Sequence, residues 1–64
     1  MKRKDLIKHL LSNGCILERE GARHSVFLNT LIGKSSTVPR LNEIDNWLSK
    51  KICKDLGIKL PIKK

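Results

Sequence analysis

The 64-residue chain has few aromatic residues and no long apolar run. Phe27 and Trp47 are its only rings apart from two histidines. Without a predominantly apolar stretch of about 20 residues, it cannot supply a membrane-spanning helix. Its first four residues are basic, like the start of a signal peptide, but Asp5 and Lys8 interrupt the apolar stretch that would have to follow. We therefore expect a cytoplasmic location and no membrane partner.

Acidic residues are also scarce. Six Asp and Glu stand against fourteen Lys and Arg, which gives a net charge of +8. Such a surplus on a small domain favours a polyanionic partner, such as nucleic acid or an acidic protein. No acidic cluster suits magnesium, and Cys15 and Cys53 lie far apart without the further ligands that zinc needs. We predict no metal and no cofactor, and we interpret both cysteines as small buried apolar side chains.

Hydrophobic spacing predicts a helix near each end of the chain. Leucine and isoleucine at positions 6, 7, 10 and 11 share one face of a helix over about residues 4–13, which ends at Asn13-Gly14. A second helix runs from Leu41 or Asn42 to Leu56, with Trp47 at its apolar border. Its apolar residues recur every four positions, at Ile44, Leu48, Ile52 and Leu56.

Three strands are predicted between the helices. Two β-rich runs flank Gly21-Ala22, a pair that favours a two-residue type II′ hairpin turn. This turn would pair Glu20 with Arg23 and place Arg19 opposite His24. A weak third strand over residues 34–38 ends at Pro39. The order helix, three antiparallel strands, helix predicts an α+β fold with both helices on one face of the sheet, the architecture of double-stranded-RNA-binding domains.

Several short motifs occur together in one order. Gly14 precedes the first strand, Gly21-Ala22-Arg23-His24 forms the hairpin, and Thr37-Val38-Pro39-Arg40 precedes the second helix. That helix ends in the segment from Lys51 to Ile58. With this joint spacing, the chain resembles the HicA toxin family, the small partners of HicA–HicB toxin–antitoxin pairs, over nearly its whole length.

The resemblance implies a double-stranded-RNA-binding-like fold and a metal-independent ribonuclease that cuts mRNA and arrests growth. It also implies a HicB partner that covers the active site. The histidine of the family's Gly-x-x-His pattern is catalytic, and here it is His24. The chain departs from the family at Leu41, where members often carry His, at Thr30, where many carry Pro, and at Trp47, where a smaller residue is usual. Leu41 removes a possible second imidazole, not the one at His24.

The residues themselves offer suitable chemistry. RNA is cleaved when its 2′-hydroxyl attacks the adjacent phosphate, and histidine suits the proton transfers because it accepts or donates at neutral pH. Arginine can bond two phosphate oxygens at once. We expect His24 to move the proton while Arg19 and Arg23 hold the phosphate. Lys34 and Arg40, near the third strand, are the further candidates for RNA binding.

Two questions about His24 stay open at this point. On spacing alone, a solvated surface histidine is the simpler interpretation, and the family resemblance reverses that preference. Strict alternation also puts His24 on the same face as Val26 and Leu28, which are natural core residues. Either the strand begins irregularly at His24, or Phe27 and Ile16 face the helices instead.

We therefore predict a HicA-like toxin domain over residues 1–58 and a basic tail over residues 59–64. The predicted function is that of an mRNA endoribonuclease toxin, inhibited by a HicB-like antitoxin that is acidic where it touches the protein. The alternatives are a small RNA-binding module without chemistry and a toxin whose active site has decayed. We expect His9 to be a solvent-exposed helix residue without a catalytic role.

Overall fold

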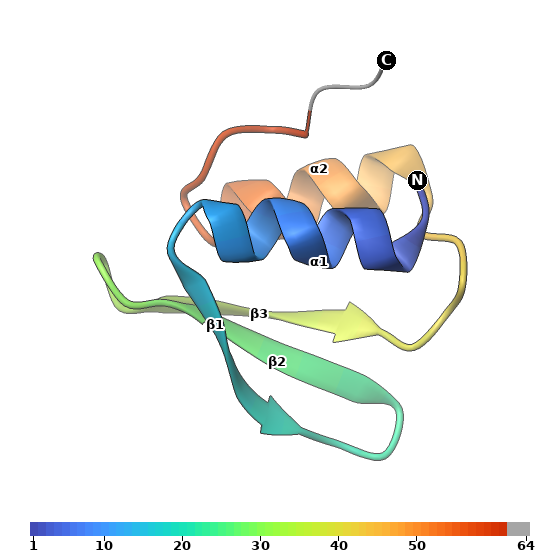
Figure 1. Cartoon of the computed structure of the whole chain (residues 1–64), viewed down its shortest axis with the longest axis horizontal. Helices are drawn as coiled ribbons and strands as arrows, with labels where there is room; N and C mark the ends of the chain where they lie inside the picture. Colours follow the sequence, from blue (N-terminus) through green and yellow to red (C-terminus); the bar gives the residue numbers. More distant parts are fainter. Residues whose placement is uncertain (62–64) are drawn as a thin grey trace.

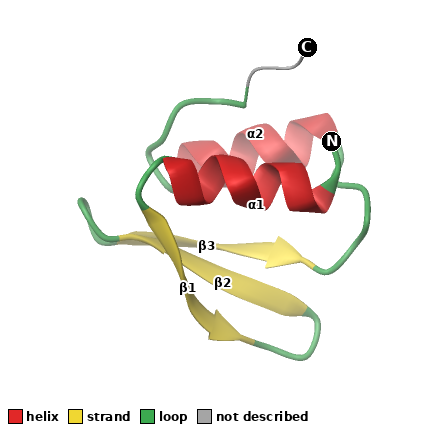
Figure 2. Cartoon of the chain, viewed as in Figure 1, coloured by secondary structure: helices red, strands yellow, loops and turns green. Residues whose placement is uncertain are grey.

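The computed structural model describes residues 1–61, so the last three residues of the predicted tail lie outside it. Both helices lie side by side on one face of a three-stranded antiparallel sheet (Figure 1). This confirms the predicted α+β fold, and in the part described no helix is long and apolar enough to cross a membrane. The elements, coloured by type in Figure 2, are α1 (Arg3–Ser12), β1 (Cys15–Glu20), β2 (His24–Asn29), β3 (Lys34–Pro39) and α2 (Asn46–Asp55).

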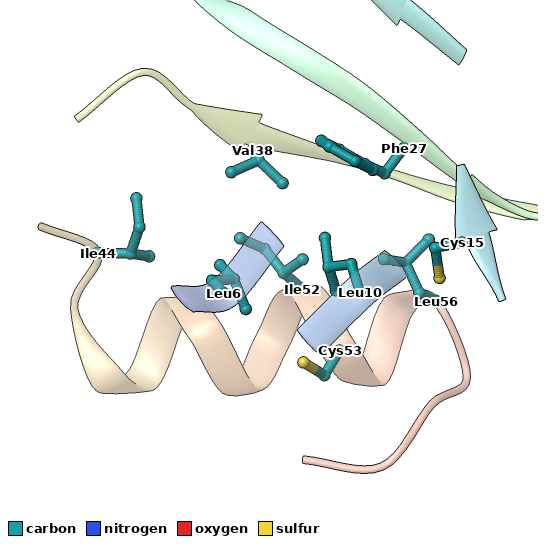
Figure 3. Packing of buried hydrophobic residues seen from close by; sticks show 9 residues of the cluster. All are labelled: Leu6, Leu10, Cys15, Phe27, Val38, Ile44, Ile52, Cys53 and Leu56. Carbon is teal, nitrogen blue, oxygen red and sulfur yellow. The ribbon is translucent and has the colours of Figure 1, made fainter. Parts of the chain in front are cut away.

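An aliphatic core fills the space between the helices and the sheet (Figure 3). Leu6 and Leu10 of α1, Ile52 of α2 and Leu56 at its end meet Phe27 of the central strand, all at most 3% exposed. Each such side chain stabilises the fold by about 1.5–3 kcal/mol when fully buried. The smaller members of the core are Cys15, Val38, Ile44 and Cys53, and the burial of both cysteines confirms their interpretation as apolar core residues.

The connection from β3 to α2 is longer than predicted, because α2 begins at Asn46 rather than at Leu41 or Asn42. The backbone of this connection bonds the start of the chain instead of itself. Asn42 O accepts a hydrogen bond from Arg3 N at 2.9 Å, and Ile44 N donates to Met1 O at 2.7 Å. Ile44 is still fully buried, but Trp47, predicted at the apolar border of the helix, is 64% exposed.

The β1–β2 hairpin also differs from the predicted turn. A bulge at Glu18 shifts the register, so that Arg19 pairs with Val26 and Glu20 with Ser25. Three residues separate the strands, and the loop closes through a 2.7 Å hydrogen bond from Gly21 N to His24 O. Gly21 has no positive φ, so the predicted type II′ turn is wrong. A Cβ atom there would lie 3.0 Å from His24 O, and glycine is therefore needed for close approach.

The bulge leaves β2 with a clear division of its two faces. Phe27 points into the core, whereas His24, Val26 and Leu28 alternate onto the face that the helices leave open. The second alternative from the sequence is therefore right for Phe27. It is wrong for Ile16, which pairs with Leu28 and is 48% exposed on the same open face.

Candidate active site

His24 is the first residue of the central strand, at the end of the sheet that carries the β1–β2 hairpin. Its side chain is exposed, and its ring makes no hydrogen bond to any other residue within 1–61. Its backbone is held on two sides, since His24 O accepts from Gly21 N and the residue pairs with Pro39 of β3. An accessible imidazole is thus presented on a fixed backbone.

Arg19 shares the open face with His24, although the predicted pairing between them is wrong. Arg19 lies opposite Val26, two residues along β2, which makes it a diagonal neighbour of His24. Side chains in this relation are about 7–8 Å apart at Cα, within reach of a long side chain. Thr37 of β3 occupies the equivalent diagonal position on the other side of Val26. The arginine therefore remains close enough to act on the same ligand as the imidazole.

A shallow pocket of about 350 Å³ lies beside the His24 ring. It combines the hairpin with the chain that follows β3, and its lining consists of Arg23, His24, Pro39, Arg40 and Leu41. Three of the residues predicted from the sequence, the histidine and two arginines, therefore meet in one place.

The two arginines of this pocket are held differently. The Arg40 guanidinium bonds the Glu20 carboxylate and donates to Gly21 O at 2.9 Å, so it closes the base of the hairpin. The Arg23 side chain is exposed and makes no hydrogen bond or ion pair within the described residues. Of the two, Arg23 has its five donors available for a phosphate.

A polar network under the hairpin fixes the pocket to α1. Ser25 is 1% exposed; its Oγ accepts from Arg3 Nη2 and donates to a Glu20 carboxylate oxygen, each at 2.8 Å. Arg3 also donates through Nε to Pro39 O at 3.0 Å. One side chain at the start of α1 thus connects the two strands on which the pocket is built.

Lys34 is not brought to this pocket. It pairs with Asn29 at the far end of β2, five residues along β3 from Pro39. At roughly 3.3 Å per residue, this places its backbone about 16 Å from the pocket. Of the five predicted site residues, the structure gathers His24, Arg23 and Arg40, keeps Arg19 on the same face and sets Lys34 apart.

Comparison with known proteins fits this geometry. The chain matches, over residues 3–58, a family model described as HicA toxin of bacterial toxin-antitoxin. The protein belongs to the HicA toxin family. No curated protein and no solved structure matches the chain. HicA membership makes this chain the toxin of a toxin–antitoxin system and implies an antitoxin as its partner.

The positions at which this HicA chain departs from the family pattern lie in different places. Leu41 lines the pocket beside His24 and is 59% exposed. Thr30 lies at the opposite end of the sheet, where its Oγ1 donates to Gly14 O at 3.4 Å. Trp47 is exposed at the start of α2 and does not line the pocket. Only Leu41 can therefore alter the chemistry around the imidazole directly.

A second, larger hollow of the HicA chain lies between the two helices. Its volume is about 970 Å³, and lysines dominate its lining, at positions 2, 4, 8 and 50. Its histidine, His9, is half-buried rather than exposed as predicted, because Nε2 donates to the backbone oxygen of Lys59 at 2.7 Å. This bond attaches the first residues of the predicted tail to α1. The larger hollow is thus positively charged, but its imidazole is already engaged.

Other groups with possible chemistry are less suitable in this HicA chain. Burial raises the pKa of the Cys15 thiol, and burial together with Cys15 raises the pKa of the Cys53 thiol to about 11. Buried thiols that stay protonated are poor nucleophiles. No group of three or more His, Cys, Asp or Glu side chains among residues 1–61 is arranged to hold a metal ion.

The sequence gave no sign of three residues that shape this site, namely Arg3, Glu20 and Ser25. Arg3 belongs to a basic start that sequence reasoning treats as a solvated helix end. Ser25 is identified as inward-facing only once Phe27, two residues later on β2, is known to face the core. The alternation of the strand is the one signal that could have found it.

Proposed function

We propose that this HicA-family toxin is a metal-independent endoribonuclease that cuts mRNA with His24 as its general acid–base group. The observation that carries the proposal is the exposed imidazole in a pocket beside the unpaired guanidinium of Arg23. The net charge of +8 supports association with a polyanion, with an affinity that falls steeply as salt rises.

In this mechanism, a nitrogen of His24 takes the proton from a 2′-hydroxyl, whose oxygen attacks the adjacent phosphorus. The bond from phosphorus to the 5′-oxygen breaks, and that oxygen receives a proton from the imidazolium or from water. The products are a 2′,3′-cyclic phosphate and a 5′-hydroxyl. Proton transfer of this kind contributes about 10²–10⁴-fold to the rate.

The phosphate is held by the arginines around the imidazole. Arg23 binds the reacting phosphate with its free guanidinium, and Arg19 reaches the same group from its diagonal position. Arg40 contributes positive charge while it keeps the hairpin closed. Lys34 contacts RNA, if at all, several nucleotides away, because it lies at the other end of the sheet.

The partner proposed for this toxin is a HicB-like antitoxin in the cytoplasm that covers the pocket. Its contact surface should be acidic, because exposed arginines at Arg19 and Arg23 would otherwise be buried without a counter-charge. Sequestration suits a protein of this size, which has no further domain within the described residues to cover the site.

A second candidate function, a small RNA-binding module without chemistry, is favoured by one observation. General bases are usually oriented by a third group, and the His24 ring has no such hydrogen-bond partner within residues 1–61. Both candidates predict salt-sensitive RNA binding, and only the ribonuclease predicts cleavage that depends on His24.

Cleavage of an RNA oligonucleotide in EDTA tests the proposal. We expect wild-type protein to yield 2′,3′-cyclic phosphate ends, to leave the 2′-deoxy version intact and to be blocked by the cognate antitoxin. His24→Ala should lose at least 100-fold in rate while RNA affinity stays within about two-fold. Cleavage or growth arrest that survives His24→Ala would remove this residue from the mechanism, and binding without cleavage would favour the RNA-binding module.

A further inference from the structure

The pocket beside His24 has two chemically different walls. Arg23, Arg40 and the imidazole form a polar wall, whereas Pro39 and Leu41 form an apolar one. Leu41 is 59% exposed and is not part of the hydrophobic core. The apolar wall thus contributes nothing evident to folding, although it lies next to the one free imidazole of the described chain.

The backbone holds Leu41 in this position from both sides. On one side, Arg40 N donates to Arg23 O at 3.2 Å, and on the other, Asn42 O accepts from Arg3 N at 2.9 Å. Pro39 is fixed as well, through its pairing with His24 and through the bond from Arg3 to its carbonyl oxygen. An exposed leucine on a backbone held in this way is preorganised for a ligand, which lowers the entropic cost of binding.

We infer that Pro39 and Leu41 form a base-binding subsite for a nucleotide next to the linkage on which His24 acts. A nucleotide combines an anionic phosphate with the apolar face of a base, and the pocket offers a matching pair of walls about one nucleotide apart. The inference rests on the proposed function, since it assigns RNA to the same pocket. It adds which side chains of this chain contact the base.

The chemistry of the wall also sets the kind of selectivity. Neither Pro39 nor Leu41 carries a side-chain donor or acceptor, so the wall reads the area of a base and not its hydrogen-bonding edge. Apolar stabilisation grows with the area removed from water. Purines should therefore bind more tightly than pyrimidines at this position, by a modest factor and without strict sequence specificity.

Leu41→Ala tests the subsite, with Leu31→Ala as the matched control, because Leu31 is 83% exposed in the turn at the opposite end of the sheet. Affinity is measured for six-nucleotide adenylate, uridylate and abasic ribose–phosphate chains. All variants carry His24→Ala, so that the chains stay intact whether or not wild-type protein cleaves RNA. We expect Leu41→Ala to weaken adenylate binding roughly five-fold, uridylate binding less, and abasic binding not at all. Leu31→Ala should leave all three unchanged.

Equal affinities of Leu41→Ala and its parent for adenylate would overturn the subsite, and so would an equal loss on the abasic chain. A loss confined to binding of the antitoxin would also overturn it and assign the wall to the protein interface. The proposed function fails separately, when wild-type protein cuts no RNA. In that case a base-dependent effect at Leu41 would still establish the subsite on a protein that only binds RNA.

Discussion

Two hollows of the protein combine a histidine with positive charge, and they differ in what those groups are free to do. The hollow between the helices is larger, about 970 Å³ against about 350 Å³. Its His9 is bonded to the Lys59 carbonyl oxygen, and its cations are lysines. In the smaller pocket, the His24 ring and the Arg23 guanidinium have no partner within residues 1–61. Free groups for proton transfer and phosphate binding, rather than volume, distinguish the candidate site.

Exchanging each histidine for glutamine is the most direct way to break this comparison. His24→Gln keeps a polar side chain but cannot carry the proton, so we expect RNA cleavage to fall by at least about 100-fold. His9→Gln changes only a bond to the tail, and cleavage should stay within about two-fold of wild type. The measurement is the initial rate on one labelled RNA. Comparable losses in both variants would mean that the hollows do not differ as argued.

Arginine and lysine can be compared in the same way. Arg23→Gln removes the free guanidinium from the pocket, and a charge-assisted hydrogen bond is worth about 1.5–3 kcal/mol. We therefore expect cleavage to fall roughly ten- to a hundred-fold. Lys8→Gln removes one charge from the hollow between the helices and should leave the cleavage rate nearly unchanged. Similar effects of the two substitutions would indicate that net charge, not placement, governs activity.

The network under the small pocket has no counterpart among the described bonds of the larger one, and stability measurements sharpen that contrast. Ser25→Ala leaves Arg3 Nη2 without its 2.8 Å acceptor at a buried position. A lost buried partner costs about 1–3 kcal/mol of unfolding free energy. Ser35→Ala, at an exposed position on β3, is the matched control and should cost less than about 0.5 kcal/mol. Urea unfolding measures both, and equal stabilities would assign the network no structural role.

Local periodicity explains why the elements could be predicted from the sequence. The first helix was expected over residues 4–13 and is found at Arg3–Ser12, because its apolar residues recur on one face and Gly14, with a φ of 85°, ends it. The start of α2 could not be predicted, since residues 42–44 bond the beginning of the chain, which is a tertiary contact. The hairpin register was missed because one bulged residue inverts the alternation on which it was based.

The site was predictable to a similar extent. His24 and Arg23 are adjacent in the sequence, so any hairpin at Gly21 brings them to one end of the sheet. Leu41 could be noted only as a departure from the family, because its place in the pocket depends on the late start of α2. The role of Ser25 depends on the bulge and on the approach of α1 to the hairpin. What sequence reasoning missed are therefore contacts between elements, not properties of single elements.

The lysines of the larger hollow test whether it binds RNA at all. Replacing Lys4, Lys8 and Lys50 together by glutamine lowers the net charge from +8 to +5, since each substitution removes one positive charge. If these residues supply only a general field, RNA affinity should fall about two- to three-fold and the salt dependence should change little. A direct contact would lower the slope by about 0.7 for each phosphate lost from a single strand. A change near two would therefore identify a second RNA-binding surface.

The core between the hollows sets the upper pH limit for these comparisons. Burial, and to a lesser degree Cys15, raises the pKa of the Cys53 thiol to about 11 from an ordinary value of 9.0. Between these values the folded protein keeps a proton that the unfolded chain releases, so stability falls as pH rises through this window. We expect the thermal midpoint of wild-type protein to fall more steeply from pH 9 to 11 than that of Cys53→Ala. The variant is less stable overall because of the small cavity, so the slopes carry the test, and parallel curves would contradict it.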